Sequence, residues 1–100
     1  MLKKLPNAFA GTDLADRVGD HPGRPLVICG FMTHMCVSAT ARAAIDLGFE
    51  TVTVSDATAT RALPSATGGD AVSAHDVHVA ALAALADRFS VVSTTADLTG

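Results

Sequence analysis

Cys36 is the residue of this sequence whose type and position best suit covalent chemistry. It stands in the segment Gly30-Phe31-Met32-Thr33-His34-Met35-Cys36-Val37, between an apolar run and a helical pattern. Ligands of open parallel sheets bind where a strand ends and a helix begins. Backbone N–H groups and the positive end of the helix dipole stabilise a thiolate there, and they can also hold an oxyanion. The position makes Cys36 a candidate nucleophile, but on position alone an inert buried cysteine is the favoured interpretation.

Five other residues have side chains that could do chemistry, and most are interpreted structurally. Cys29 lies inside the apolar run and is predicted to be a small core residue. His34 is expected either to touch substrate or to have a surface or capping role. His75 and His78 have a possible metal spacing, but without a third ligand no metal is predicted. Arg42 is expected to form an ion pair at the surface or sheet edge.

An alternation of helices and strands must position these residues. The run Leu26–Cys29 is fully apolar and stops at Gly30, which favours a strand buried on both faces of a parallel sheet. The other predicted elements are a short helix over 12–19, a helix over 37–45 that Gly48 ends, a strand over 49–54, a loop over 57–70, a helix over 73–89 with Ser73 as its N-cap, and a strand over 91–94. This order predicts an α/β fold with right-handed crossovers and a parallel sheet.

Three strands with two crossover helices make half of a doubly wound fold. The first strand would normally lie centrally, with a partner on its other side. Residues 1–24 contain no pattern that could supply that partner. We therefore expect residues 1–100 to be one partial domain, the C-terminal half of a larger one.

Composition excludes several classes of function. The 100 residues are 49% hydrophobic and 17% charged, with a net charge of −3 and seven Lys and Arg together, which argues against nucleic-acid binding. No apolar run reaches the roughly 18–20 residues of a membrane span, and no signal-peptide pattern is present. Two cysteines make no disulfide framework or zinc site. We expect a soluble, cytoplasmic domain with free thiols.

Three segments together resemble one known family. Residues 30–42, Gly-Phe-Met-Thr-His-Met-Cys-Val-Ser-Ala-Thr-Ala-Arg, resemble the nucleophile segment of the isochorismatase-like cysteine hydrolases, which include nicotinamidases and N-carbamoylsarcosine amidohydrolases. Residues 55–60, Ser-Asp-Ala-Thr-Ala-Thr, look like the family's Asp-Ala motif. Residues 3–14 look like the segment that carries its catalytic lysine. The resemblance implies the family's three-layer α/β/α, doubly wound (Rossmann-like) hydrolase fold, here as its C-terminal half.

The resemblance also implies a catalytic triad of Cys, Lys and Asp. Cys36 takes the nucleophile position and Lys3 the lysine position, with Lys4 as the less favoured alternative. The family's aspartate, a general base, comes from a strand before the lysine segment, and no residue of this sequence matches it. Backbone N–H groups of Met32 and Cys36 would hold the oxyanion. Asp56 is expected to have a structural role at a strand end.

The remaining site features follow from the same alignment. The family has a cis peptide bond shortly before the cysteine, which here falls at Phe31–Met32. Phe9, Phe31 and His34 are candidates for the substrate pocket. The metal of nicotinamidases is bound by residues that have no match here, so neither a metal nor another cofactor is predicted.

The leading hypothesis is therefore a hydrolase of a non-peptide C–N bond, amide or carbamoyl, that works through a thioester. The small-molecule amide is the expected partner, and a homo-oligomer is the expected assembly. Because one triad member is unmatched, we expect weak or no turnover by this chain alone. The alternative is a non-catalytic remnant or interaction module of the same fold. A vinyl-ether hydrolase like isochorismatase itself is less favoured, because such enzymes lack the cysteine.

Overall fold

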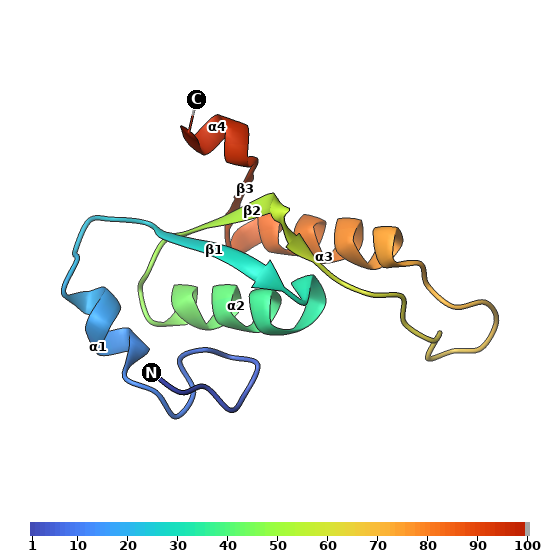
Figure 1. The fold of residues 1–100 in the computed structure, drawn as a ribbon, viewed down its shortest axis with the longest axis horizontal. Helices are drawn as coiled ribbons and strands as arrows, with labels where there is room; N and C mark the ends of the chain where they lie inside the picture. Colours follow the sequence, from blue (N-terminus) through green and yellow to red (C-terminus); the bar gives the residue numbers. More distant parts are fainter. Residues whose placement is uncertain (100) are drawn as a thin grey trace.

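The computed structural model describes residues 1–99 and shows an α/β fold (Figure 1). Its elements in chain order are α1 (Leu14–Gly19), β1 (Leu26–Phe31), the π-helical turn η1 (Thr33–Val37), α2 (Ser38–Asp46), β2 (Thr51–Ala59), α3 (Ala74–Arg88), β3 (Val91–Ser93) and α4 (Thr95–Thr99). None of the helices within residues 1–99 is long and apolar enough to cross a membrane.

The sheet is parallel throughout, as the alternation of elements predicts. Its strand order is β1-β2-β3, with Leu26 opposite Thr51 and Val52 opposite Val91. The register between β1 and β2 shifts after Ile28, so that the end of β1 pairs with the later residues of β2. Among the described residues, β1 is therefore an edge strand, and its other edge is unpaired.

The core lies between the sheet and two helices on one of its faces. Ile28 of β1 packs with Val37 at the end of η1, with Ala41 of α2 and with Leu85 of α3. Ala41 and Leu85 are fully buried. An alanine in this position lets α2 approach the sheet closely, because its side chain ends at the methyl group. One cluster thus joins β1, α2 and α3 directly behind the strand that leads to Cys36.

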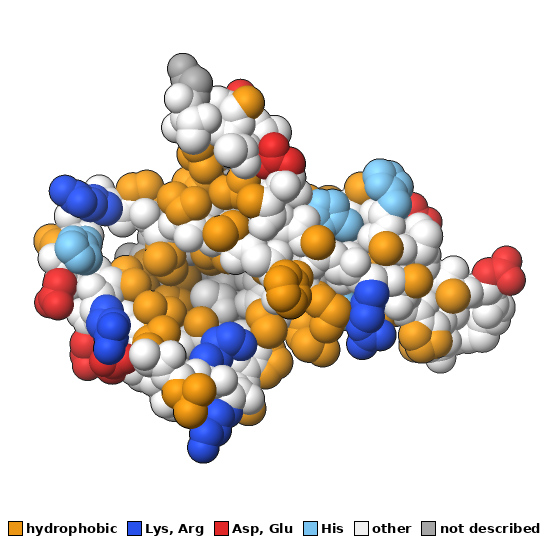
Figure 2. Space-filling view, in the orientation of Figure 1, with side chains coloured by type: hydrophobic (Ala, Val, Ile, Leu, Met, Phe, Trp, Pro, Cys, Tyr) orange, Lys and Arg blue, Asp and Glu red, His pale blue; other side chains and the backbone are white. Residues whose placement is uncertain are grey.

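The opposite face of β1 is open, which corrects one expectation. Cys29 is exposed rather than a core residue, and Val27 is 51% exposed. Successive strand residues point to opposite faces, so Val27 and Cys29 turn away from Ile28 and from both long helices. Residues 1–99 thus supply the sheet and one helix layer of the predicted three. Figure 2 shows hydrophobic side chains gathered across the middle of one side of the molecule.

Local signals at two helix ends are confirmed. The Ser73 hydroxyl accepts a hydrogen bond from the Asp76 N–H at 3.1 Å, which is the predicted cap of α3. Gly48 has a φ of +87°, the left-handed conformation expected of a residue that follows α2. The positions at which α3 begins and α2 ends depend on interactions between residues a few positions apart, so the sequence alone predicts them.

Two elements differ from the prediction. Strand β2 extends to Ala59, beyond the predicted end at residue 54, because the register shift lets Gly30 and Phe31 pair with Thr58 and Ala59. The short helix α4 was not predicted. Both differences arise from contacts with distant parts of the chain, which local periodicity does not contain.

Candidate active site

Cys36 lies in the turn that connects the end of β1 to α2. The turn is π-helical over Thr33–Val37 and follows Met32, whose backbone is extended (φ −94°, ψ 146°). The cis peptide bond expected at Phe31–Met32 is present. The Cys36 side chain is half-buried, so it is held by the turn yet open on one side. The predicted strand–turn–helix setting of the thiol is confirmed.

A lysine from the N-terminal segment reaches this thiol. Lys3 Nζ lies 3.5 Å from Cys36 Sγ and donates a second hydrogen bond to the Leu5 carbonyl at 2.8 Å. Lys4, the alternative lysine, forms no such bond within residues 1–99. The structure thus brings together Cys36 and the residue that the motif alignment favours, although 33 residues separate them in the sequence.

The Lys3 segment is fastened to α2 by one threonine. Thr40 Oγ1 accepts a hydrogen bond from the Ala8 N–H at 3.0 Å and donates one to the Pro6 carbonyl at 3.4 Å. Thr40 is buried and stands one helical turn after Cys36. The side chain that fixes the lysine segment is therefore carried by the same stretch of backbone as the thiol.

A groove runs beside the unpaired edge of β1, between this strand and the N-terminal segment. Its volume is about 410 Å³, and Lys3, Phe31 and Cys36 are among the residues that line it. Phe31 is 76% exposed, so its ring is free to contact a bound molecule. A cation, a thiol and an aromatic ring thus share one groove at the carboxyl end of β1.

The other two predicted pocket residues do not line this groove. Phe9 stacks on Phe49, with ring centroids 5.9 Å apart, and thereby packs the N-terminal segment against the loop after α2. His34 Nδ1 is 2.6 Å from Thr60 Oγ1, just beyond the end of β2. Of the three candidates, Phe31 alone is brought together with Cys36 and Lys3 in the groove.

His78 of α3 contacts the turn that carries Cys36, which the sequence did not predict. Its Nε2 is 3.1 Å from the Ser55 carbonyl, and its Nδ1 is 2.8 Å from Thr33 Oγ1. Because a carbonyl only accepts, Nε2 carries the proton, and in the neutral ring Nδ1 accepts from the Thr33 hydroxyl. No cluster of three or more metal-ligating side chains is found in residues 1–99; His75 is exposed, and His78 is half-buried. No local sequence signal distinguishes this role.

Asp56 has the structural role expected of it. Its Oδ1 accepts hydrogen bonds from the Thr95 N–H at 2.9 Å and the Thr95 hydroxyl at 2.8 Å. These two bonds, that from the backbone first, lower the pKa of the Asp56 carboxyl below its usual value. The carboxylate thus holds the start of α4 against the end of β2.

Arg42 does not form the predicted ion pair. Its guanidinium lies 4.4 Å from the centre of the Phe89 ring, and its Nε donates to the Ser38 hydroxyl at 3.1 Å. The ion pair that residues 1–99 do contain joins Arg17 and Asp13. Because α2 packs beside the end of α3, an aromatic face rather than a carboxylate meets Arg42.

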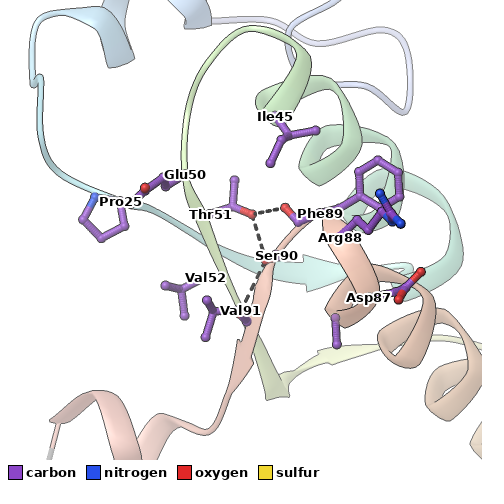
Figure 3. Close-up of a pocket in the computed structure, with 11 residues that line it drawn as sticks. Pro25, Ile45, Glu50, Thr51, Val52, Asp87, Arg88, Phe89, Ser90 and Val91 are labelled. Carbon is purple, nitrogen blue, oxygen red and sulfur yellow. Dashed lines mark hydrogen bonds between the residues drawn. The ribbon is translucent and has the colours of Figure 1, made fainter.

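A larger hollow, of about 540 Å³, lies at the opposite ends of the strands (Figure 3). Pro25, Val52 and Val91 contribute to its walls. The Thr51 hydroxyl is hydrogen-bonded to Ser90 Oγ at 2.7 Å and contacts the Phe89 carbonyl at 3.1 Å. Two of its polar side chains, Thr51 and Ser90, are thus hydrogen-bonded to each other, and no cysteine or lysine among the described residues lines the hollow. Cys36 and Lys3 line the groove beside β1 instead.

Comparison with known proteins identifies the family. The family model described as the isochorismatase domain matches residues 1–97. An isochorismatase family protein of Bacillus subtilis is 39% identical over 95 residues, which cover 95% of this chain and 52% of that protein. The streptothricin hydrolase of Streptomyces noursei is 40% identical over 91 residues, covering 90% and 36% respectively.

Solved structures agree. An isochorismatase from Pseudomonas putida superposes with a TM-score of 0.88 at 39% identity, covering 95% of this chain and 48% of that one. A cysteine hydrolase from Pseudomonas syringae gives 0.88 at 31% identity, covering 96% and 45%. The chain spans about half the length of the relatives it matches. With the strand–turn–helix around Cys36, these matches show that the chain belongs to the isochorismatase family of hydrolases.

Proposed function

We propose that this chain carries the nucleophile and the lysine of a cysteine hydrolase that cleaves a non-peptide C–N bond, amide or carbamoyl. The observation that carries the proposal is the 3.5 Å approach of Lys3 Nζ to Cys36 Sγ at the carboxyl end of β1. A cation at this distance favours the thiolate over the thiol, and the thiolate is the attacking species. The similarity to proteins named cysteine hydrolase and streptothricin hydrolase supports the same chemistry.

The reaction proceeds in two halves. The thiol proton passes to the family's aspartate, which no residue between 1 and 100 matches, and Cys36 Sγ forms a bond to the substrate carbonyl carbon. The C–N bond then breaks, and the amine or ammonia leaves with a proton, which gives a thioester. Water adds to the thioester carbonyl, the C–S bond breaks, and the acid leaves while the thiol is restored. No redox step occurs, so we propose no cofactor.

Two backbone N–H groups are assigned to the oxyanion. Met32 lies in extended conformation just before the π-helical turn, and Cys36 lies within the turn. Donors that are fixed before the substrate binds stabilise a developing negative charge without reorganisation. This assignment rests on the family alignment and on the position of Cys36 in the lining of the groove, with Met32 directly after the groove residue Phe31.

The groove favours a small-molecule amide. Lys3 supplies one positive charge and Phe31 an exposed aromatic ring, and a cavity of about 410 Å³ admits a compact molecule. Homo-oligomeric assembly and a cytoplasmic location are part of the same proposal.

Ammonia or amine release from a panel of small amides and carbamoyl compounds, including streptothricin, tests the proposal. We expect activity to be lost in Cys36→Ser and kept in Cys29→Ser. Both cysteines line the groove, but within residues 1–99 the Lys3 ammonium contacts Cys36 and not Cys29. Mass spectrometry of the protein after brief exposure to substrate should detect the acylated Cys36. Unchanged turnover in Cys36→Ser would exclude Cys36 as the nucleophile.

A second candidate function, an interaction module without turnover, is favoured by the exposed apolar side chains Val27 and Phe31 on the edge strand β1. It predicts that copies of the chain associate through β1 and that no substrate of the panel is cleaved. A monomer by light scattering that releases ammonia from an amide would exclude it.

A further inference from the structure

We propose that His78 is a positioning residue for the nucleophile, acting through the Thr33 hydroxyl. The inference rests on the proposed function, because it takes Cys36 as the reacting thiol. His78 does not line the groove and lies 42 positions after Cys36 in the sequence. Its role is to hold the turn that carries Cys36 in place.

One imidazole joins three elements of the fold. Through Nε2 it is bound to the Ser55 carbonyl of β2 at 3.1 Å, and through Nδ1 to Thr33 Oγ1 of η1 at 2.8 Å. The ring itself is carried by α3, whose Leu85 is fully buried against β1 and α2. Because α3 and β2 are both part of the packed core, His78 connects the turn to the rigid part of the molecule.

The Thr33 hydroxyl cannot replace its hydrogen bond to His78 with one to water. Its side chain is fully buried, so its hydroxyl cannot exchange His78 for bulk water. A buried hydroxyl without a partner is costly, so the bond to His78 strongly favours one position of Thr33.

The turn depends on such an anchor. It is a single π-helical turn in which the Met32 carbonyl accepts from both Met35 N–H, at 3.0 Å, and Val37 N–H, at 3.3 Å. Isolated π-helical turns are rare, and they are found most often at functional sites. Thr33 is the first residue of the turn and Cys36 the fourth, so a shift of Thr33 moves Sγ relative to Lys3 Nζ.

The test measures how fast Cys36 reacts with iodoacetamide, which requires no substrate. All variants carry Cys29→Ser, so that Cys36 is the remaining thiol. Thr33→Val removes the hydroxyl at nearly constant volume, Thr33→Ser keeps it, and His78→Gln removes the imidazole while keeping a polar side chain. Circular dichroism confirms that each variant is folded.

We expect Thr33→Val and His78→Gln each to slow alkylation near neutral pH about 3- to 10-fold, the equivalent of one lost hydrogen bond. Thr33→Ser should restore the rate. The double variant should be no slower than either single variant, because both break the same contact. Restoration of the rate by Thr33→Ser distinguishes the loss of this one hydrogen bond from a general loosening of the turn.

Two failures are distinguishable. If Cys36 of the Cys29→Ser parent reacts no faster than free cysteine, the proposed nucleophile is wrong. If it is reactive but Thr33→Val and His78→Gln match the parent, or their effects add, the positioning role is wrong. Should Thr33→Val lose its fold, the comparison of His78→Gln with the parent decides alone.

Discussion

Replacing Lys3 with methionine isolates the contribution of its charge to the reactivity of Cys36. The change keeps an unbranched side chain of similar length and removes the ammonium group 3.5 Å from Sγ. Lys3 is exposed, so the dielectric constant of water applies, and Coulomb's law then gives about 1 kcal/mol between unit charges at this distance. Because about 1.4 kcal/mol is a factor of ten, Lys3→Met should slow the alkylation of Cys36 about 5- to 10-fold.

The assay is alkylation of Cys36 near neutral pH in the Cys29→Ser background, followed by mass spectrometry. Lys4→Met is the matched control, since it removes the same charge one residue away. About 1 M salt should reduce the difference between Lys3→Met and the parent, because screening acts over about 3 Å there. Equal rates in Lys3→Met and the parent, or equal losses in Lys3→Met and Lys4→Met, would refute the assignment of the lysine.

Three further predictions concern the supports of the site. Thr40→Val should speed hydrogen exchange of the Ala8 amide several-fold, because Thr40 Oγ1 accepts the hydrogen bond of this amide. Exchange measured by mass spectrometry would be unchanged if other contacts held the Lys3 segment in place. Leu85→Ala should lower the free energy of unfolding by about 2–5 kcal/mol in urea, and a loss below about 1 kcal/mol would contradict a core centred on this residue. The pKa of Asp56 is lowered in the folded protein, so the ionised carboxylate stabilises the fold. This stabilisation is fully present above the ordinary pKa of 3.8, and it is lost as pH falls through the lower pKa of the folded state. The Thr95 amide resonance should follow this titration, and a resonance independent of pH in that range would exclude the contact.

The order of elements and the location of the thiol could be predicted from the sequence, because both have local causes. The apolar run from Leu26 and the helical spacing after Val37 place a strand and a helix around Cys36, and α2 and α3 end or begin at signals within a few residues. Burial could not be predicted in the same way. The composition of Cys29 and its neighbours suits a core strand, yet exposure depends on what covers each face of the sheet, and both long helices lie on the other one.

The sequence by itself determined that a cysteine lies in a strand-to-helix turn of a parallel α/β unit, since turn residues and hydrophobic periodicity act over short distances. Only the tertiary structure decided which distant groups meet that turn. Lys3 rather than Lys4 reaches Sγ, and the Thr33 hydroxyl meets the His78 ring. Such pairs are separated by 33 and 45 residues, and which side chains meet depends on the faces along which helices and strands pack. Hydrogen bonds form only at defined distances and angles, so packing selects one partner among residues that look alike in the sequence.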